Sequence, residues 1–462
     1  MGEQQKITVV EAVNGFPSKF IALVLIIAGI GFMWDLGFDA YIVGATVPTI
    51  SKQFAISTAT ASLMVSLGTA GMGVGAILAG YMSDILGRRR LFLITMAIIS
   101  IGSFLVALAT SYAWILVWRT VMGFGIGAEV PVIASYVNEM VPGKRRGRLY
   151  SLANASAVFG TVIVSFLGAY LIPTYTYGWR LLYIIGALGA VVFLIMRFAY
   201  MPESPRWLLK KGRFSDAEEV IRKIYDKYLG GGAKGFQLDR SVPPESRFSY
   251  RMLFSSDVVR RTVLMALWWI LLIFAFWSVE AYLPTYLVKE GYSIASSLVF
   301  TAVASIAALV FYPIAAYFAD RYERKHMLAF LLIANTILAM GFGFSRTVAG
   351  ILIFGFLIWG SLDMFAWYAH MYTNEMFPTS ARSSGDGLAE GVGRIAGLWT
   401  LTIIPTYILP LPNGVLIAFS LIAVVLLVMA GMIMLGPKVT KRELEEIEAP
   451  KTQEIEVPKA PR

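Results

Sequence analysis

The chain has 462 residues, of which 57% are hydrophobic and only 15% are charged, and its formal net charge is +10. Soluble domains average about half apolar and about a quarter charged residues, so this composition excludes an ordinary soluble protein and favours a membrane protein. The absence of cysteine excludes disulfides and thiolate metal sites, and we expect neither a metal nor a cofactor.

Apolar stretches of about 20 residues, long enough to cross roughly 30 Å of hydrocarbon as helices, recur along the chain. In chain order they lie at about 20–47, 60–82, 91–111, 113–138, 149–171, 179–201, 262–287, 294–318, 327–345, 347–372, 384–407 and 413–436. The sequence therefore predicts an all-α membrane protein with twelve transmembrane helices. We expect four regions, which are an N-terminal six-helix half (1–201), a cytosolic linker (202–261), a C-terminal six-helix half (262–436) and a cytosolic tail (437–462). Residues 214–228 of the linker predict a short amphipathic helix.

Basic residues are distributed unevenly between the connections. The two tails and the connections after helices 2, 4, 6, 8 and 10 hold 32 of the 39 Lys and Arg residues, and the opposite connections hold only Lys52, Arg180, Lys289 and Arg346. This positive-inside asymmetry predicts a multi-pass protein of the cell membrane, embedded in the lipid bilayer with both termini in the cytoplasm. The basic excess then reports topology, so we expect no nucleic-acid partner. We also expect a monomer.

Two pairs of motifs share an offset of 236 residues. The connection after helix 2 reads YMSDILGRR from Tyr81, and the connection after helix 8 reads YFADRYERK from Tyr317. Helix 4 ends in YVNEMVP from Tyr136, and helix 10 ends in YTNEMFP from Tyr372. Two unrelated segments with one offset indicate two homologous, pseudo-symmetric six-helix bundles.

With these motifs the chain resembles the major facilitator superfamily. The DxxGRR pattern at 84–89 is similar to the signature loop of that superfamily, and residues 320–325 are similar to its degenerate second copy. The glycine-rich run from Arg119 to Pro131 resembles the branch that holds nicotinate and aromatic-acid permeases and the synaptic-vesicle-like proteins. The segment PESPRWLL from Pro202 is similar to sugar porters, but helix 7 lacks the glutamines that sugar porters use for sugar hydroxyls.

The resemblance implies a secondary transporter that works by alternating access, and not an enzyme. We expect proton symport of a small organic anion, such as an aromatic or other carboxylate. The alternative is a sugar-porter-like proton:sugar symporter. In either case the partners are a small-molecule substrate and a proton.

Helix 1 carries two acids, Asp35 and Asp39, which are four residues apart and therefore share one helix face. Ionisable residues are expensive in hydrocarbon, so both are candidates for function. Gly37-Phe38-Asp39 resembles the helix 1 motif of proton-coupled sugar porters, which implies that Asp39 carries the proton and pairs with Arg119. Asp35 could replace Asp39, and a static ion pair is the alternative. Glu129 is roughly 15 Å from Arg119 along helix 4, so it either lines the inner cavity or is capped by a neighbouring helix.

The candidate substrate-binding residues are Arg394, Glu129, Trp277, Glu280, Tyr368, His370 and Glu390. Arg394 is placed near the midplane, where its guanidinium could hold an anion by a bidentate contact. Neutralisation of Arg394 by Glu390 is the alternative. Trp277 and Tyr368 lie deep enough to stack on a ring-bearing substrate. His370 titrates near neutrality, and a packing role for it stays open.

A last set of charged residues lies at the cytosolic helix ends. Its members are Asp84, Arg88, Glu139, Arg146, Asp320, Arg324, Glu375 and Arg382. By resemblance these residues form ion-pair networks that close the cytosolic side in the outward-open state. Exposed pairs contribute only about 0–1 kcal/mol each, which suits a latch that opens in every cycle.

Overall fold

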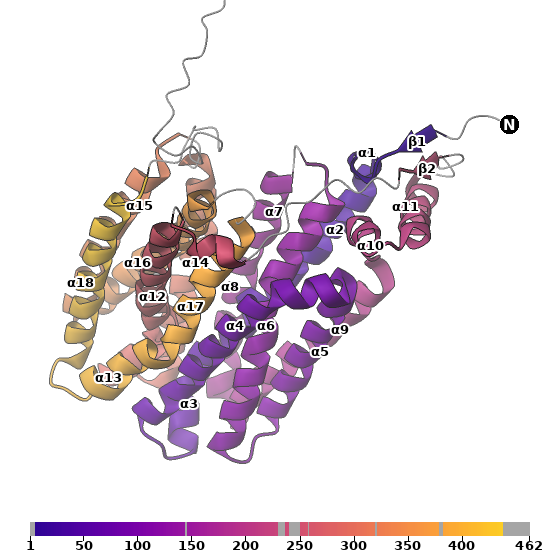
Figure 1. Cartoon of the computed structure of the whole chain (residues 1–462). Helices are drawn as coiled ribbons and strands as arrows, with labels where there is room; N and C mark the ends of the chain where they lie inside the picture. The colour runs from indigo at the N-terminus through magenta and orange to yellow at the C-terminus, as the bar shows by residue number, and fades with distance from the viewer. Residues whose placement is uncertain are drawn as a thin grey trace, which may run out of the picture.

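The structure, a computed structural model, describes residues 5–143, 146–229, 236–239, 250–256, 258–318, 321–377 and 382–437. Of residues 5, 6, 146–148, 236, 237, 250, 251, 382 and 383 it describes the backbone alone. The described chain is nearly all helical, and its helices form two groups that stand side by side (Figure 1). One group comes from the first half of the sequence and the other from the second half.

The N-terminal group begins with a long first helix that has three parts. They are α2 (Ser18–Gly31), the π-helical turns η1 (Phe32–Asp39) and α3 (Ile42–Gln53). The following helices are α4 (Thr58–Leu86), α5 (Arg88–Ala107), α6 (Tyr112–Met140), α7 (Arg146–Ala155), α8 (Ala157–Thr174) and α9 (Gly178–Tyr200).

The C-terminal group repeats this pattern. Its helices are α12 (Val259–Glu280), α13 (Leu283–Lys289), α14 (Ile294–Phe318), α15 (Arg324–Phe344), α16 (Val348–Met376), α17 (Arg382–Ile403), η3 (Ile404–Ile408) and α18 (Gly414–Met434). The span expected at 262–287 is divided after Glu280, because Pro284 stands in the first turn of α13 and lacks the N–H that would continue the helix.

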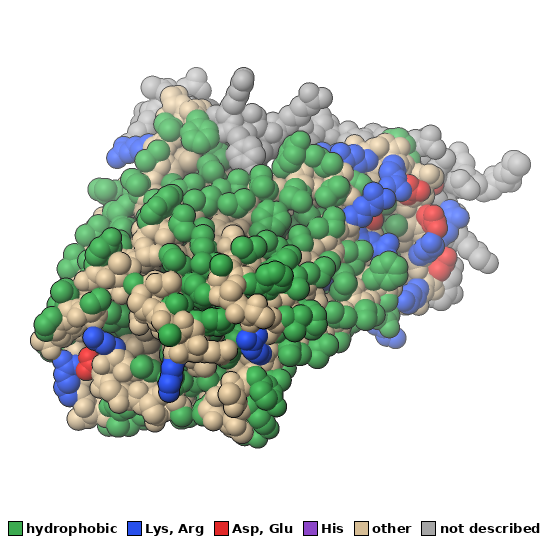
Figure 2. All heavy atoms as spheres, turned by 90° about the horizontal axis from the view of Figure 1, so that it is seen from below, with side chains coloured by type: hydrophobic (Ala, Val, Ile, Leu, Met, Phe, Trp, Pro, Cys, Tyr) green, Lys and Arg blue, Asp and Glu red, His purple; other side chains and the backbone are tan. Residues whose placement is uncertain are grey.

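Eleven helices of the described chain are long and apolar enough to cross a membrane. The twelfth expected span is formed by α17 and η3, in which Glu390, Arg394 and several glycines lower the hydropathy. The expected twelve-helix fold is thereby confirmed. The outward-facing sides of the bundles carry many exposed apolar residues, and Figure 2 shows such side chains over most of the face seen from below.

A small layer covers one end of the N-terminal group. The strand β1 (Gln5–Ile7) pairs in parallel with β2 (Phe236–Leu238), and the short helices α1 (Val9–Asn14) and α10 (Pro205–Lys210) lie nearby with α11 (Phe214–Leu229). The α11 helix coincides with the expected amphipathic helix. A 3-10 turn, η2 (Tyr250–Phe254), precedes α12.

The two groups contact each other along two seams, α4 against α17 and α8 against α14. In the first seam the backbones are very close, because a Cβ on Gly73 would lie 2.6 Å from the carbonyl oxygen of Gly391. At the end opposite α11 the groups also meet through α3 and α13. There a Cβ on Gly44 would lie 3.1 Å from the Ala281 carbonyl oxygen, and the Tyr282 hydroxyl donates to the Ser62 carbonyl at 3.5 Å.

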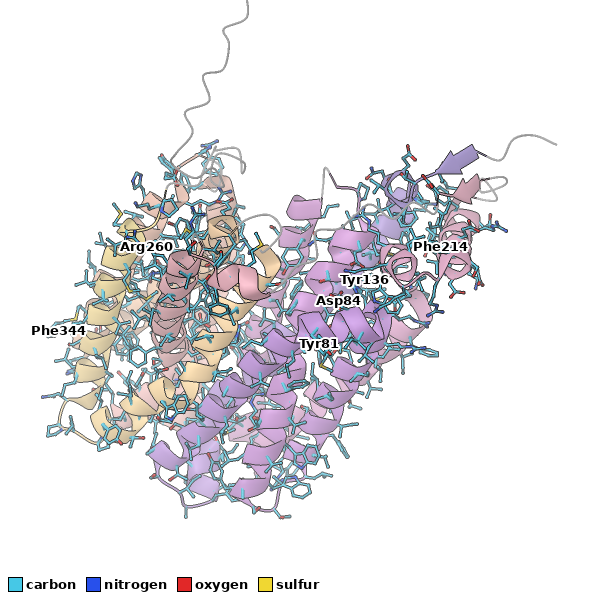
Figure 3. All side chains as sticks on the ribbon, in the orientation of Figure 1. Tyr81, Asp84, Tyr136, Phe214, Arg260 and Phe344 are labelled. Carbon is cyan, nitrogen blue, oxygen red and sulfur yellow. The ribbon has the colours of Figure 1, made fainter. Side chains whose placement is uncertain are left out.

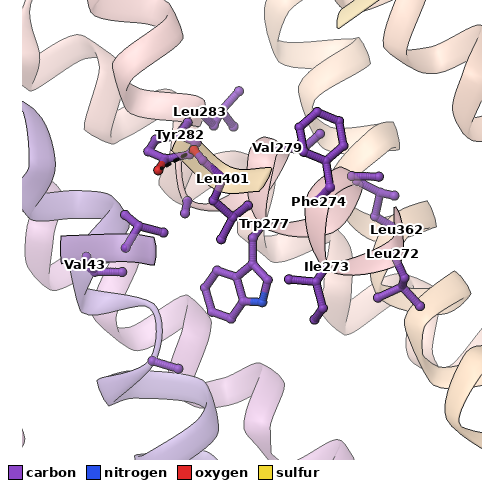
Figure 4. Close-up of a cluster of buried hydrophobic side chains, with 14 of the residues drawn as sticks. Val43, Leu272, Ile273, Phe274, Trp277, Val279, Tyr282, Leu283, Leu362 and Leu401 are labelled. Atoms are coloured by element: carbon purple, nitrogen blue, oxygen red, sulfur yellow. Dashed lines mark hydrogen bonds between the residues drawn. The ribbon is translucent and has the colours of Figure 1, made fainter. Parts of the chain in front are cut away.

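Figure 4 shows Val43 across from a cluster of buried side chains that includes Trp277, Tyr282 and Leu401. Val43 is 1% exposed. We call this contact between α3 and the α12–α13 turn the outer seam, and we call the opposite end of the molecule, where α11 lies, the inner end; both are labels for the two ends. Because the outer seam is closed, a path to the space between the groups must come from the other end.

Candidate functional site

A cavity of about 160 Å³ lies between the two groups. Its wall includes Leu36, Tyr41, Val130, Tyr150, Asn154, Ala157, Val158, Thr161, Trp269, Leu272, Ile273, Phe276, Trp277, Tyr312, Asp363, Ala366, Trp367, His370, Asn374, Asp386, Glu390 and Arg394. The wall extends from Tyr41 and Trp277, beside the outer seam, to Asn374 and Asp386 at the α11 end. Both halves contribute, so the cavity lies between them, and its wall extends toward the α11 end.

Arg394 lies on the cavity wall and is ion-paired with Glu390, one turn earlier on α17. Its Nε donates to Glu390 Oε1 at 2.7 Å, and its Nη2 lies 2.5 Å from the same oxygen. Its Nη1 contacts the Met72 sulfur at 3.5 Å, and a thioether is a weak acceptor. The ion pair with Glu390, which the sequence left open as the alternative to anion binding, is therefore formed, while one edge of the guanidinium remains poorly satisfied.

His370 and Asp386 extend the charged wall toward the inner end. The His370 Nδ1 lies 3.8 Å from Asp386 Oδ2, and the Trp269 ring lies 4.7 Å from the imidazole. His370, Asp386 and Glu390 place one ligand atom each within 4.8 Å of one another. Because Arg394 already neutralises Glu390, this group is poorly suited to a cation.

The expected ion pair between Asp39 and Arg119 is not formed. Arg119 donates instead to the backbone carbonyls of Asp39 and Ala40, each at 2.9 Å. The π-helical turns of η1 widen the helix there and leave these carbonyls free to accept. Asp39 is 0% exposed, and neither of its carboxyl oxygens has a hydrogen-bond partner among the described residues.

Glu129 does not line the cavity. It forms an ion pair with Arg197 of α9 and accepts a hydrogen bond from the Thr95 hydroxyl at 2.5 Å. Both side chains of the pair are at least 98% buried, since they expose 1% and 2%. The alternative in which a neighbouring helix caps Glu129 is the one the structure forms. Asp35, also buried and without a hydrogen-bond partner in the described chain, lies close enough to both to interact electrostatically.

Two further candidates lie behind the cavity wall. The Tyr368 hydroxyl donates to the Ala315 carbonyl at 2.9 Å, and the residue is 0% exposed. Tyr368 therefore does not line the cavity, whereas its neighbour Trp367 does. Glu280 is 2% exposed and accepts a hydrogen bond from the Tyr41 hydroxyl. Trp277 does line the cavity, with its ring 5.4 Å from that of Tyr41.

The charged residues at the inner helix ends pair within each half. Arg88 lies 3.1 Å from Asp84 and 2.7 Å from Glu139, and Arg324 lies 3.0 Å from Glu375. Figure 3 labels Asp84 and Tyr136, which both lie on the N-terminal group. Asp320 lies outside the described residues, as do the side chains of Arg146 and Arg382.

Three residues that the sequence did not single out are central to this geometry. Tyr41 had no motif to mark it. Arg197 had a signal, since an arginine at the end of a span needs a partner. Glu203, within the PESPRWLL segment, accepts from the backbone N–H groups of Arg88 and Arg89 at 2.9 and 3.2 Å, and it thereby caps α5.

The fold is that of a multi-pass membrane protein with a cavity of small-molecule size between its two halves. A family model described as the Major Facilitator Superfamily matches residues 29–401. The chain belongs to this superfamily, and it is a transporter and not an enzyme.

Several known proteins are similar to the chain. The niacin transporter NiaP of Acinetobacter baylyi is 31% identical, over 93% of this chain and 97% of that protein. The benzoate transport protein of the same organism is 24% identical, over 81% of each chain. Among solved structures, the inward open conformation of the xylose transporter XylE from E. coli has a TM-score of 0.72 at 19% identity, with 93% of this chain and 99% of that chain covered. At this identity the likeness to XylE shows the fold alone.

Proposed function

We propose that this protein is a proton symporter for a small organic anion that carries a carboxylate on an aromatic ring. In this proposal it works as a monomer in the cell membrane, with both termini in the cytoplasm. Residues 1–201 and 262–436 are the two moving halves, 202–261 is the cytosolic linker and 437–462 is the tail.

The position of Arg394 carries the proposal for an anion. Its guanidinium lies on the cavity wall, and its Nη1 contacts only a thioether among the described residues. A carboxylate could accept from this edge while Glu390 keeps the other, which would replace a weak contact by a charge-assisted hydrogen bond. Trp269, Trp277 and Trp367 line the same cavity and offer faces for an aromatic ring.

The similarity to relatives supports the same substrate class. Proteins described as transporters of niacin and of benzoate align with most of this chain. Both of those substrates are single aromatic rings, and the cavity of about 160 Å³ is below the roughly 300–1,000 Å³ of pockets for drug-sized ligands.

Asp39 is the proposed proton carrier. Its carboxyl group is buried, has no hydrogen-bond partner in the described chain, and lies beside Arg119. Uptake of a proton there breaks no existing bond of the carboxyl group. The Arg119 guanidinium, held by two helix 1 carbonyls, would transmit a change at Asp39 to the contact between η1 and α6.

The inner ion pairs are proposed to act as a gate. In the present arrangement, with the outer seam closed, Arg88 pairs with Glu139 and Arg324 pairs with Glu375, each inside its own half. When the inner ends approach each other, these groups would be available for contacts between the halves.

The anion proposal is tested by binding to the purified protein. Arg394→Ala should weaken binding of nicotinate and benzoate by about 10- to 150-fold, because a hydrogen bond to a charged group contributes about 1.5–3 kcal/mol. Arg346→Ala, at an exposed pair with Glu290 on the outer side, is the matched control and should leave affinity unchanged. Tighter binding of xylose than of either acid would refute the anion proposal and favour a sugar symporter.

Proton coupling is tested in proteoliposomes. An inward proton gradient should drive uptake by the natural protein, and Asp39→Asn should abolish that accumulation while preserving exchange of internal for external substrate. Accumulation by Asp39→Asn that equals the natural protein's would exclude Asp39 as the carrier.

A further inference from the structure

The C-terminal half holds a second pair of buried acids, Glu280 on α12 and Asp363 on α16. Glu280 is 2% exposed and Asp363 is 7% exposed. The two carboxyl groups lie close enough to interact electrostatically. In the described chain no Lys or Arg lies within 4.0 Å of either carboxyl group, and Glu280 Oε1 has no hydrogen-bond partner. This pair therefore differs from Glu129 and Glu390, which both have an arginine.

Among the described residues, two phenols face this pair. Tyr41, between η1 and α3, donates its hydroxyl hydrogen to Glu280 Oε2, and Tyr312 of α14 interacts electrostatically with both acids. Arg394 and Glu390 of α17 line the same cavity but neutralise each other. Within the described residues the two acids thus lack a cation.

One acid of the pair, Asp363, lies on the wall of the central cavity. Asp363, Tyr41 and Tyr312 line the cavity that extends to the inner end of the molecule. Glu280 lies directly behind Tyr41, at the outer seam. An ion in the cavity can consequently reach Asp363 directly, and a movement of Tyr41 at the outer seam would open the way to Glu280.

The hydrogen bond from Tyr41 to Glu280 joins the two halves. Tyr41 belongs to the first helix of the N-terminal group, and Glu280 is the last residue of α12 in the C-terminal group. The bond lies beside the Tyr41 and Trp277 rings and close to the contact of Gly44 with Ala281. It is thus part of what holds the outer seam closed.

We propose that Glu280 and Asp363 form a binding site for a monovalent cation, H⁺ or Na⁺, whose occupancy loosens the Tyr41–Glu280 bond and favours opening of the outer seam. An ionised Glu280 accepts a charge-assisted hydrogen bond from Tyr41, which is roughly twice as strong as a bond to a neutral acceptor. A cation bound at the pair neutralises the Glu280 carboxylate and so weakens the hydrogen bond from Tyr41. This site is separate from Asp39 and from Arg394.

If this site exists, substitutions of its residues should change the opening of the outer seam in opposite directions. Glu280→Gln imitates the neutral state and Tyr41→Phe removes the bond, so both should favour the open outer seam. Asp363→Asn removes the like charge and half of the cation site, so Glu280 keeps its charge and the seam should open less. A site that only packs the helices would give the same sign for all three.

Because the chain has no cysteine, a single Val43→Cys in the full-length protein can report on the seam. In right-side-out membrane vesicles, the rate of labelling by a membrane-impermeant maleimide measures how often the seam opens. Thr285→Cys on α13, which is 6% exposed, is a second reporter if Val43→Cys does not fold. Labelling is compared at pH 8 and pH 6, with each rate divided by the rate for a free thiol at the same pH because maleimides react with the thiolate. It is compared separately in Na⁺ and in choline at pH 8.

We expect one of the two cations to raise labelling of the reporter protein about five- to tenfold. Glu280→Gln and Tyr41→Phe should label fast under all conditions, and Asp363→Asn should label more slowly than the reporter alone. Glu290→Gln, an exposed outer acid, is the matched control and should change nothing.

Three results would overturn the inference. They are no response to either cation, faster labelling of Asp363→Asn, or a response that survives Glu280→Gln but is lost in Asp39→Asn. The last outcome would assign the response to the proposed proton carrier of the N-terminal half. Conversely, failure of proton-driven uptake with an intact labelling response would refute the proposed function and leave this site standing.

Discussion

The position of Glu129, in a buried ion pair with Arg197 and not on the cavity wall, can be tested quantitatively. Both side chains are almost wholly buried, and Asp35 adds a second carboxyl group nearby. Replacement of Arg197 by Met keeps most of the side-chain volume but leaves Glu129 without its cation. Two charges about 3 Å apart attract by roughly 5 kcal/mol at an effective dielectric constant of about 20, and breaking one partner of a buried pair costs about 3–5 kcal/mol.

The double variant Glu129→Gln with Arg197→Met removes both charges. A buried pair replaced as a unit is often nearly neutral, so we expect the double variant to recover most of the loss. At about 2 °C per kcal/mol, the low end of the range for soluble domains, the single variant should lower the melting temperature by roughly 6–10 °C.

The assay is thermal unfolding of the purified protein in detergent, with substrate affinity measured in parallel. Because Glu129 does not line the cavity, affinity should change less than twofold in the double variant. Equal destabilisation by the single and double variants would refute the ion-pair reasoning. A large loss of affinity with an unchanged melting temperature would restore Glu129 to the substrate site.

Two further predictions concern packing and capping. Gly160→Ala should prevent stable folding, because the new Cβ would lie 1.8 Å from the Met33 carbonyl oxygen. Gly80→Ala is the control and should fold normally, because no atom lies within 4 Å of its new Cβ. Size-exclusion chromatography distinguishes the two variants by whether the protein elutes as a single monodisperse peak. Glu203→Gln should lower stability by about 1–2 kcal/mol through the weakened cap on the Arg88 and Arg89 amides. Unchanged thermal unfolding of Glu203→Gln would show that the cap contributes nothing.

Much of this architecture follows from the sequence alone. The apolar stretches had to become helices, because a backbone in hydrocarbon must satisfy its own hydrogen bonds. The shared offset of 236 residues indicates, without any knowledge of contacts, that the two halves are homologous. Arg394 and Glu390, four residues apart on one helix, could be paired because i,i+4 neighbours share a helix face.

Partners on different helices were decided only by tertiary structure. Arg119 was expected to meet the Asp39 carboxyl group, but the wide π-helical turns offer it two carbonyl oxygens instead. Glu129 forms an ion pair with Arg197, 68 residues away, and Tyr41 donates a hydrogen bond to Glu280, 239 residues away. Helix periodicity tells which residues share a face but not how that face is rotated toward its neighbours, and a rotation of one residue, about 100°, exchanges one partner for another.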